Sequence, residues 1–240
     1  MTEEEWLTLE KPEQLLDFFT DDLRSWLPGN LYPRKFRLFS VACCRLVAPP
    51  HIDPRSKNAL DVAERDADGL AADGEIDQAW HSANEVGGNI FAECAAAAAT
   101  PFLCLGTRIS LGGLEEALAE TSPYSVACVV MFAAASMFVY DGPLSPIQAK
   151  LQSAACFNRL IYDIFGNPFR PITLNPSWLT STVVALAQGI YNDRAFDRMP
   201  ILADALQDAG CDNEQILNHC REPGVHVRGC FVVDLLLDKK

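Results

Sequence analysis

The feature that most constrains the fold is a recurring separation of three, four and three residues between apolar side chains. This spacing places side chains on one face of an α-helix, whereas a half-buried strand would alternate strictly. A further window, Leu179-Val183-Leu186-Ile190, runs four, three and four. We therefore predict an all-α fold, a compact multi-helix bundle that can divide into two packed helical subdomains. The four windows with the first spacing are Leu16-Phe19-Leu23-Trp26, Phe36-Phe39-Cys43-Leu46, Leu60-Ala63-Ala67-Leu70 and Phe196-Met199-Ala203-Leu206.

The residues between these windows indicate where helices begin and end. Thr2 with Glu5 has the spacing of a capping box, and Gly210 is placed to end the helix that contains Leu206. A capping side chain followed by proline, which suits the first helical turn, occurs at Asp53-Pro54, Ser122-Pro123, Ser145-Pro146 and Asn175-Pro176. We place a boundary near Pro143, between an acidic amino-terminal helical subdomain (residues 1–143) and a carboxyl-terminal helical subdomain (residues 144–240).

Several shorter segments have their own expected structure. Residues 101–113 are loop-like, and residues 165–171 form a turn because two prolines interrupt them. The longest apolar run, residues 126–140, falls short of the roughly 20 residues needed to cross a bilayer, so a buried core helix is expected there. Residues 230–237 favour a strand locally through Phe231-Val232-Val233, but the three leucines after Asp234 favour a short docking helix, which we predict.

The charge of the chain argues against nucleic acid as a partner. The formal net charge is −13, and most of the excess acid lies in the first half of the chain. A surface of that sign repels phosphate backbones, which proteins bind largely through Lys and Arg. A local exception surrounds one predicted helix, and we expect it to face nearby carboxylates; it consists of Arg34, Lys35, Arg37 and Arg45.

The amino terminus and the cysteines favour a cytoplasmic protein. The opening Met1-Thr2-Glu3-Glu4-Glu5-Trp6 has neither the basic region nor the apolar region of a secretory signal, and no membrane span is expected. Nine cysteines, an odd number, are spread irregularly along the chain. Free thiols in a reducing compartment are the natural interpretation, and buried cysteines then act as small hydrophobic residues.

Well-known catalytic motifs are missing from the sequence. The chain contains no Walker P-loop, G-x-G-x-x-G, H-E-x-x-H, C-x-x-C or G-x-S-x-G pattern. No cofactor is therefore expected, apart from the zinc considered below. Catalysis is still compatible with the sequence, because active residues assemble in space and need not be adjacent in the chain.

The densest cluster of chemically reactive residues lies near the carboxyl end, where thiol and imidazole groups of the kind that bind zinc fall within twenty residues. Only His226 and Cys230 have the close spacing typical of a zinc ligand pair, so two interpretations stay open. The cluster binds zinc, or Cys211 and Cys230 fill core positions beside Gly210 and Gly229 while His219 caps a helix end. The five residues are Cys211, His219, Cys220, His226 and Cys230.

The same cluster admits a thiol-dependent enzyme. A cysteine nucleophile would use His219 or His226 as its base, and Arg221 and Arg228 would lower the thiol pKa. Arg228 and Asp234 are also candidates to hold the metal ligands in place without binding the metal themselves.

Two other groups of residues have a structural explanation. Cys43 and Cys44 are adjacent on a predicted helix and point in different directions, so core packing is expected of both. A stripe with a spacing of four could bind a metal but is typical of a solvated helix face; it consists of His81, Glu85, Asn89 and Glu93.

Several segments resemble a family of uncharacterised planctomycete proteins. At the carboxyl end these are Ile164-Phe165-Gly166-Asn167-Pro168-Phe169-Arg170-Pro171, Trp178-Leu179-Thr180, residues 190–206, residues 209–211, Ile216-Leu217-Asn218-His219-Cys220-Arg221 and residues 226–236. At the amino end they are residues 2–7 and 37–45. Phe231 stands where the family pattern has Trp. The resemblance implies a bacterial origin but carries no activity, fold or catalytic residue.

The functional hypothesis from the sequence is a non-catalytic helical module that binds a protein partner. It follows from the many predicted helices, the missing catalytic motifs and the acidic first half. The alternative is a metal-dependent or thiol-dependent enzyme that uses the carboxyl-terminal cysteines and histidines.

Overall fold

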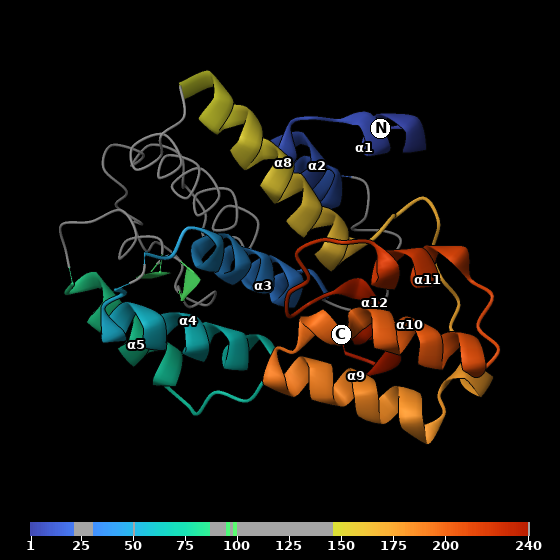
Figure 1. Ribbon diagram of the computed structural model, residues 1–240. Helices are drawn as coiled ribbons and strands as arrows, with labels where there is room; N and C mark the ends of the chain where they lie inside the picture. The colour runs from blue at the N-terminus through green and yellow to red at the C-terminus, as the bar shows by residue number, and fades with distance from the viewer. Residues whose placement is uncertain (22–30, 50, 87–94, 97, 100–145, 240) are drawn as a thin grey trace. The chain divides into compact units, whose positions relative to one another are not determined.

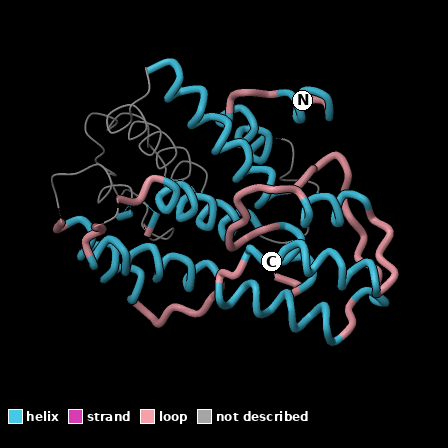
Figure 2. Tube along the Cα trace, in the orientation of Figure 1, coloured by secondary structure: helices cyan, strands magenta, loops and turns pink. Residues whose placement is uncertain are grey.

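The fold is all-α, as the spacing of apolar residues predicts. The computed structural model describes residues 1–21, 31–49, 51–86, 95–96, 98–99 and 146–239. Within these ranges every regular element is a helix, and none of these residues lies in a strand (Figure 2). The chain divides into two compact units, Met1–Ile161 and Tyr162–Lys240, which we call unit 1 and unit 2. The division falls inside a helix, later in the chain than the boundary expected near Pro143.

Unit 1 is built by helices that bury apolar faces against one another. Trp6 is fully buried, and its ring lies 5.7 Å from that of Phe18. Asn158 Nδ2 donates a hydrogen bond of 2.9 Å to the carbonyl of Leu9, which joins the last of these helices to the segment after the first. The described helices are α1 (Glu3–Thr8), α2 (Pro12–Asp21), α3 (Leu31–Leu46), α4 (Pro54–Ala67), α5 (Glu75–Asn84) and the part of α8 (Pro146–Phe165) that precedes residue 162 (Figure 1).

Arginines of α3 pair with carboxylates at and just beyond α4. Arg34 lies 3.1 Å from Asp68, and both side chains are almost fully buried. Arg37 is 3.1 Å from Asp66, and burial lowers its pKa to about 10 although the Asp66 carboxylate opposes that shift. Arg45 donates to Asp61 at 2.8 Å. The expectation that this basic group faces carboxylates is therefore confirmed for the three arginines.

Two helix starts in unit 1 follow the sequence signals. Thr2 and Glu5 form the expected capping box at α1, and Asp53 caps α4 ahead of Pro54. The apolar window ending at Leu70 is wrong at its last position, because α4 ends at Ala67 and Leu70 is exposed. The expectations for Leu23 and Trp26, for residues 101–113 and 126–140, and for Ser122-Pro123 lie outside the described residues.

Unit 2 is a set of short helices around one apolar core. Fully buried members of this core include Ile190, Met199, Leu206 and Val232. Leu179 was expected on the helical face of Ile190, but it precedes the helix and is exposed. The described elements after α8 are the 3-10 turns η2 (Pro176–Trp178) and η3 (Phe196–Arg198) and the helices α9 (Ser181–Asp193), α10 (Met199–Asp208), α11 (Glu214–Arg221) and α12 (Phe231–Leu236) (Figure 1).

The boundaries of the unit 2 helices also have clear chemical causes. Asn175 caps η2, and Asn213 accepts a hydrogen bond from Ile216 N at the start of α11. Gly210, with φ of 84°, follows the end of α10 in the left-handed conformation that glycine adopts at low cost. The predicted turn over residues 165–171 is present, and the last segment is the helix α12, as expected.

Among the described helices, none is both long and apolar enough to span a lipid bilayer.

Candidate functional site

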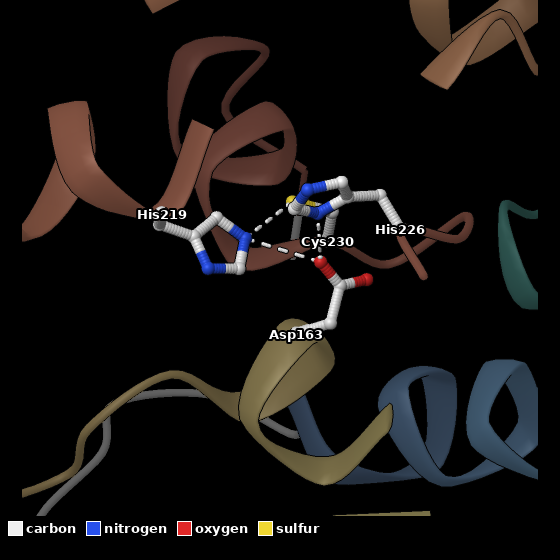
Figure 3. Close-up of side chains that lie close together, drawn as sticks. All are labelled: Asp163, His219, His226 and Cys230. Carbon is white, nitrogen blue, oxygen red and sulfur yellow. Dashed lines mark hydrogen bonds and ion pairs between the residues drawn. The ribbon is translucent and has the colours of Figure 1, made fainter. Parts of the chain in front are cut away.

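Four side chains of unit 2 converge on one point. One donor atom from each of Asp163, His219, His226 and Cys230 lies within 4.8 Å of every other (Figure 3). They combine one carboxylate oxygen, two imidazole nitrogens and one sulfur. Within the described part of the chain, this is the group whose geometry fits a metal ion.

Three chain segments carry these donors. Asp163 lies in the last turn of α8, where Figure 3 shows its carboxylate directed toward the histidines. His219 lies in the last turn of α11. His226 belongs to the irregular segment of residues 222–230, and Cys230 ends that segment as the residue before α12. The site therefore joins the end of α8 to a short stretch near the carboxyl terminus.

The donor atoms lie at hydrogen-bond distances from one another. Asp163 Oδ1 is 2.7 Å from His226 Nδ1 and 3.1 Å from His219 Nε2. His219 Nε2 is also 3.3 Å from Cys230 Sγ. The second carboxylate oxygen, Oδ2, accepts a hydrogen bond of 2.9 Å from the backbone N–H of Val227.

The site lies largely out of contact with solvent. The side chains of Asp163, His226 and His219 are 3%, 9% and 18% exposed, and Cys230 is fully buried. His226 Nε2 is enclosed and has no hydrogen-bond partner in the described part of the chain. Enclosed polar atoms cost free energy unless they are paired, and the residues that the structure describes leave this nitrogen unsatisfied.

Two opposing effects act on the carboxyl group of Asp163. Burial by itself raises its pKa, since it disfavours the charged form. Hydrogen bonds from His219 and His226, together with electrostatic attraction from the same two side chains, outweigh burial, so the net pKa of Asp163 is lowered. Asp163 is thus held as a buried carboxylate, which is the form that binds cations.

The thiols show the opposite behaviour. Burial raises the pKa of Cys230 well above its usual value, and the Asp163 carboxylate raises it further. Burial likewise raises the pKa of Cys220 to about 12, with smaller contributions from Asp163 and Cys211. A nucleophilic cysteine needs a lowered pKa, so these surroundings do not favour the thiol-dependent enzyme.

The arrangement of the imidazoles also differs from a nucleophile relay. In such a relay one ring nitrogen contacts the thiol while the other contacts the carboxylate. Here the same atom, His219 Nε2, lies near both Cys230 Sγ and Asp163 Oδ1. His226 contacts Asp163 through Nδ1, and its other nitrogen has no hydrogen-bond partner among the residues that the structure describes. The geometry is that of donors converging on a centre.

The structure brings together three of the five residues that the sequence singled out. His219, His226 and Cys230 belong to the donor group, whereas Cys211 and Cys220 do not. Cys211 and Cys220 are free thiols in the apolar core of unit 2, which matches the packing interpretation for those two. Asp234 is buried, and its backbone N–H donates to the carbonyl of Cys230.

The other two groups of interest have no comparable convergence. Cys43 and Cys44 are both fully buried, as core packing requires. His81 and Glu85 are exposed on and just after α5, in agreement with a solvated face. Asn89 and Glu93 lie outside the described residues.

Sequence reasoning missed Asp163, because it precedes the other donors by more than fifty residues. One signal was available. Leu160, Ile161 and Ile164 form the buried face of this part of α8, and Asp163 lies at the edge of that face. A carboxylate in such a position is seldom fully buried without a partner, so this position in the helix indicates that Asp163 has one.

A glycine directly after α8 lets an aromatic side chain pack next to one of the donors. Gly166 has φ of 68°, and a Cβ atom there would lie 3.1 Å from Cγ of Phe231. The Phe231 ring in turn lies 4.4 Å from the ring of His219. The glycine therefore allows a close approach between the end of α8 and the side chain that packs on a donor.

Replacing Gly166 by alanine is expected to destabilise unit 2 by about 2 kcal/mol, because it combines an unfavourable positive φ with crowding of Phe231. Urea unfolding followed by circular dichroism measures this change. Gly210→Ala is the matched control: its φ is also positive, but nothing lies within 4 Å of the added carbon. Equal losses in the two variants would show that crowding of Phe231 contributes nothing.

Comparisons with known proteins do not assign the chain to a family. No protein-family model matches the chain, and no curated protein or solved structure is significantly similar to it. The resemblance to planctomycete proteins stays a prediction.

Proposed function

We propose that unit 2 is a zinc-binding helical module in which Asp163, His219, His226 and Cys230 hold one Zn²⁺ ion in a structural, non-catalytic role. The observation that carries this proposal is the convergence of four donor atoms within 4.8 Å of one another. These donors come from separate parts of the chain, so an ion among them would cross-link α8, α11 and the start of α12.

The separations between donors support a tetrahedral ion. Zinc binds nitrogen and oxygen at about 2.0–2.2 Å and sulfur at about 2.3 Å, so ligand atoms lie roughly 3.3–3.8 Å apart in a tetrahedron. The hydrogen-bonded pairs here lie at 2.7, 3.1 and 3.3 Å. Small outward movements of these pairs, with an inward movement of the donors that lie up to 4.8 Å apart, would turn the hydrogen-bonded contacts into coordination, and the ion would take the place of the shared protons.

The donor types support zinc over the common hard cations. Thiolate and imidazole are ligands of zinc and other transition metals, whereas Mg²⁺ and Ca²⁺ prefer oxygen. Four protein donors fill a tetrahedral shell, which leaves no open position for substrate or activated water. This supports a structural role over a catalytic one.

The test is zinc content. Full-length protein reconstituted with Zn²⁺ at neutral pH and freed of loose metal should carry about one zinc per chain by elemental analysis, as a closed tetrahedral site requires. Cobalt should bind with the same stoichiometry and give the intense visible absorption of a tetrahedral ion. Protein that keeps only trace zinc would identify the four residues as a hydrogen-bonded cluster and overturn the proposal.

The protein-partner role and the cytoplasmic location remain proposals beside the zinc site. Partner binding is supported by apolar side chains on the surface of unit 2, of which Ile201 and Val225 are 55% and 45% exposed. A reducing compartment is supported by the free thiols of Cys211, Cys220 and Cys230 and would keep the Cys230 thiol available to an ion.

A further inference from the structure

The segment of residues 222–230 supplies two of the four donors, yet no helix holds it. It connects α11 to α12 in an irregular conformation, and residues 222–225 are exposed. Cys230 N donates to the carbonyl of Val227, and Val227 N donates to Asp163. Positions of donors on an irregular segment depend on contacts that fix the backbone between them.

Arg228 provides such a contact, because it lies between the two donors and reaches the end of α9. Its Nε atom donates a hydrogen bond of 3.2 Å to the carbonyl of Tyr191, and its Nη2 atom donates one of 3.2 Å to the carbonyl of Asn192. Carbonyls in the last turn of a helix have no partner within the helix and carry partial negative charge. The guanidinium therefore caps α9 with two charge-assisted hydrogen bonds.

The ring of Tyr191 strengthens this attachment. Cζ of Arg228 lies 5.1 Å from the ring centroid, and Nζ of Lys239 lies 4.2 Å from it. Tyr191 is 3% exposed and belongs to the apolar core of unit 2, so the arginine is anchored on a rigid element. A cation near an aromatic face gains further attraction when the site excludes water.

We infer that Arg228 is a positioning residue for the metal site, which fixes the His226–Cys230 segment on α9 so that both donors face Asp163 and His219. This inference rests on the proposed function. Arg228 lies between His226 and Cys230 in the chain and bonds to the carbonyls of Tyr191 and Asn192, so it acts through the backbone of the segment that carries the two donors. The arginine also links the metal site to the core, since the same side chain bonds to α9.

The shape of arginine matters for this role. The two hydrogen bonds leave different nitrogens of one planar group and reach carbonyls of successive residues. Lysine offers a single ammonium group, which cannot reproduce the fixed fork. Arg228→Lys should therefore keep the positive charge near α9 but hold the segment less firmly, whereas Arg228→Ala removes both.

The experiment measures zinc affinity of the full-length chain by competition with a chromophoric chelator, together with the visible spectrum of the cobalt form. Arg228→Ala should bind zinc roughly 10–100-fold more weakly, the range seen when a supporting residue around a metal is lost. Its cobalt bands should broaden or shift because the donors are less well ordered. Arg228→Lys should fall between this variant and the wild type.

Arg221→Ala is the matched control, since Arg221 lies on the neighbouring α11 and pairs with Asp204 and Gln207 of α10 on the surface. Its zinc affinity should stay within about twofold of wild type, as expected for an exposed pair. Wild-type affinity and spectrum in Arg228→Ala would overturn the inference. If that variant fails to fold, Arg228→Lys decides: weaker binding supports the role and unchanged binding overturns it. Wild-type protein that binds no zinc would overturn the proposed function as well.

Discussion

Replacing Cys230 by alanine is expected to lower zinc affinity by more than the roughly hundredfold that loss of a supporting residue can cost, since the ion loses its sulfur ligand outright. The cobalt form of this variant should also lose the near-ultraviolet absorption that arises from charge transfer between sulfur and metal. Affinity is measured by chelator competition, and the absorption identifies the sulfur ligand independently of affinity.

Cys220→Ala is the matched control for this change. Cys220 and Cys230 are both fully buried in the same apolar core, and burial raises the pKa of each. Truncation should therefore cost similar packing energy at both positions, on the order of 1 kcal/mol. Only Cys230 has its sulfur in the donor group, so the charge-transfer band should persist in Cys220→Ala. Loss of that band in both variants, or in neither, would contradict the assignment of Cys230 as the sulfur ligand.

Removal of the metal is expected to lower the stability of unit 2 strongly. A ligand that binds only the folded state and is present at about 1,000 times its dissociation constant adds about 4 kcal/mol to the free energy of unfolding. For a chain of this size, that energy corresponds to a fall of roughly 10 °C in Tm. Scanning calorimetry of zinc-loaded protein, with and without a chelator, measures the difference.

Two controls distinguish ligation from other effects of the chelator. Added Zn²⁺ in excess should restore the higher Tm, whereas Mg²⁺ should not, because a site with thiolate and imidazole donors is unsuited to it. The Cys230→Ala variant should show little response to the chelator. A Tm that is the same in zinc-loaded and chelator-treated wild type would contradict a structural role for the ion, even if zinc binds.

Much of the helical architecture could be predicted from local chemistry. The window Phe36-Phe39-Cys43-Leu46 falls within α3, and the capping signals at Thr2 and Asp53 mark the starts of α1 and α4. Such features depend on residues a few positions apart, which the sequence displays directly. The errors at Leu70 and Leu179 arise at helix termini, because the apolar periodicity continues beyond the end of α4 at Leu70 and begins before the start of α9 at Leu179.

The candidate site could be predicted only in part. The density of Cys and His near the carboxyl end pointed to His219, His226 and Cys230, but it could not separate them from Cys211 and Cys220. That separation depends on which side of α11 and which end of α12 face the end of α8. Asp163 joins the donor group only through this tertiary arrangement, since no local pattern in the sequence distinguishes it from the many other carboxylates.

The burial of the donors also sets how fast an ion could be exchanged. Cys230 is fully enclosed and Asp163 is almost so, and a chelator is too large to reach atoms in such a position. Release would have to wait for a transient opening of residues 222–230, and such local openings have free energies set by the contacts that they break. The rate of zinc dissociation would then equal the rate at which this segment opens, and a higher chelator concentration would not increase it.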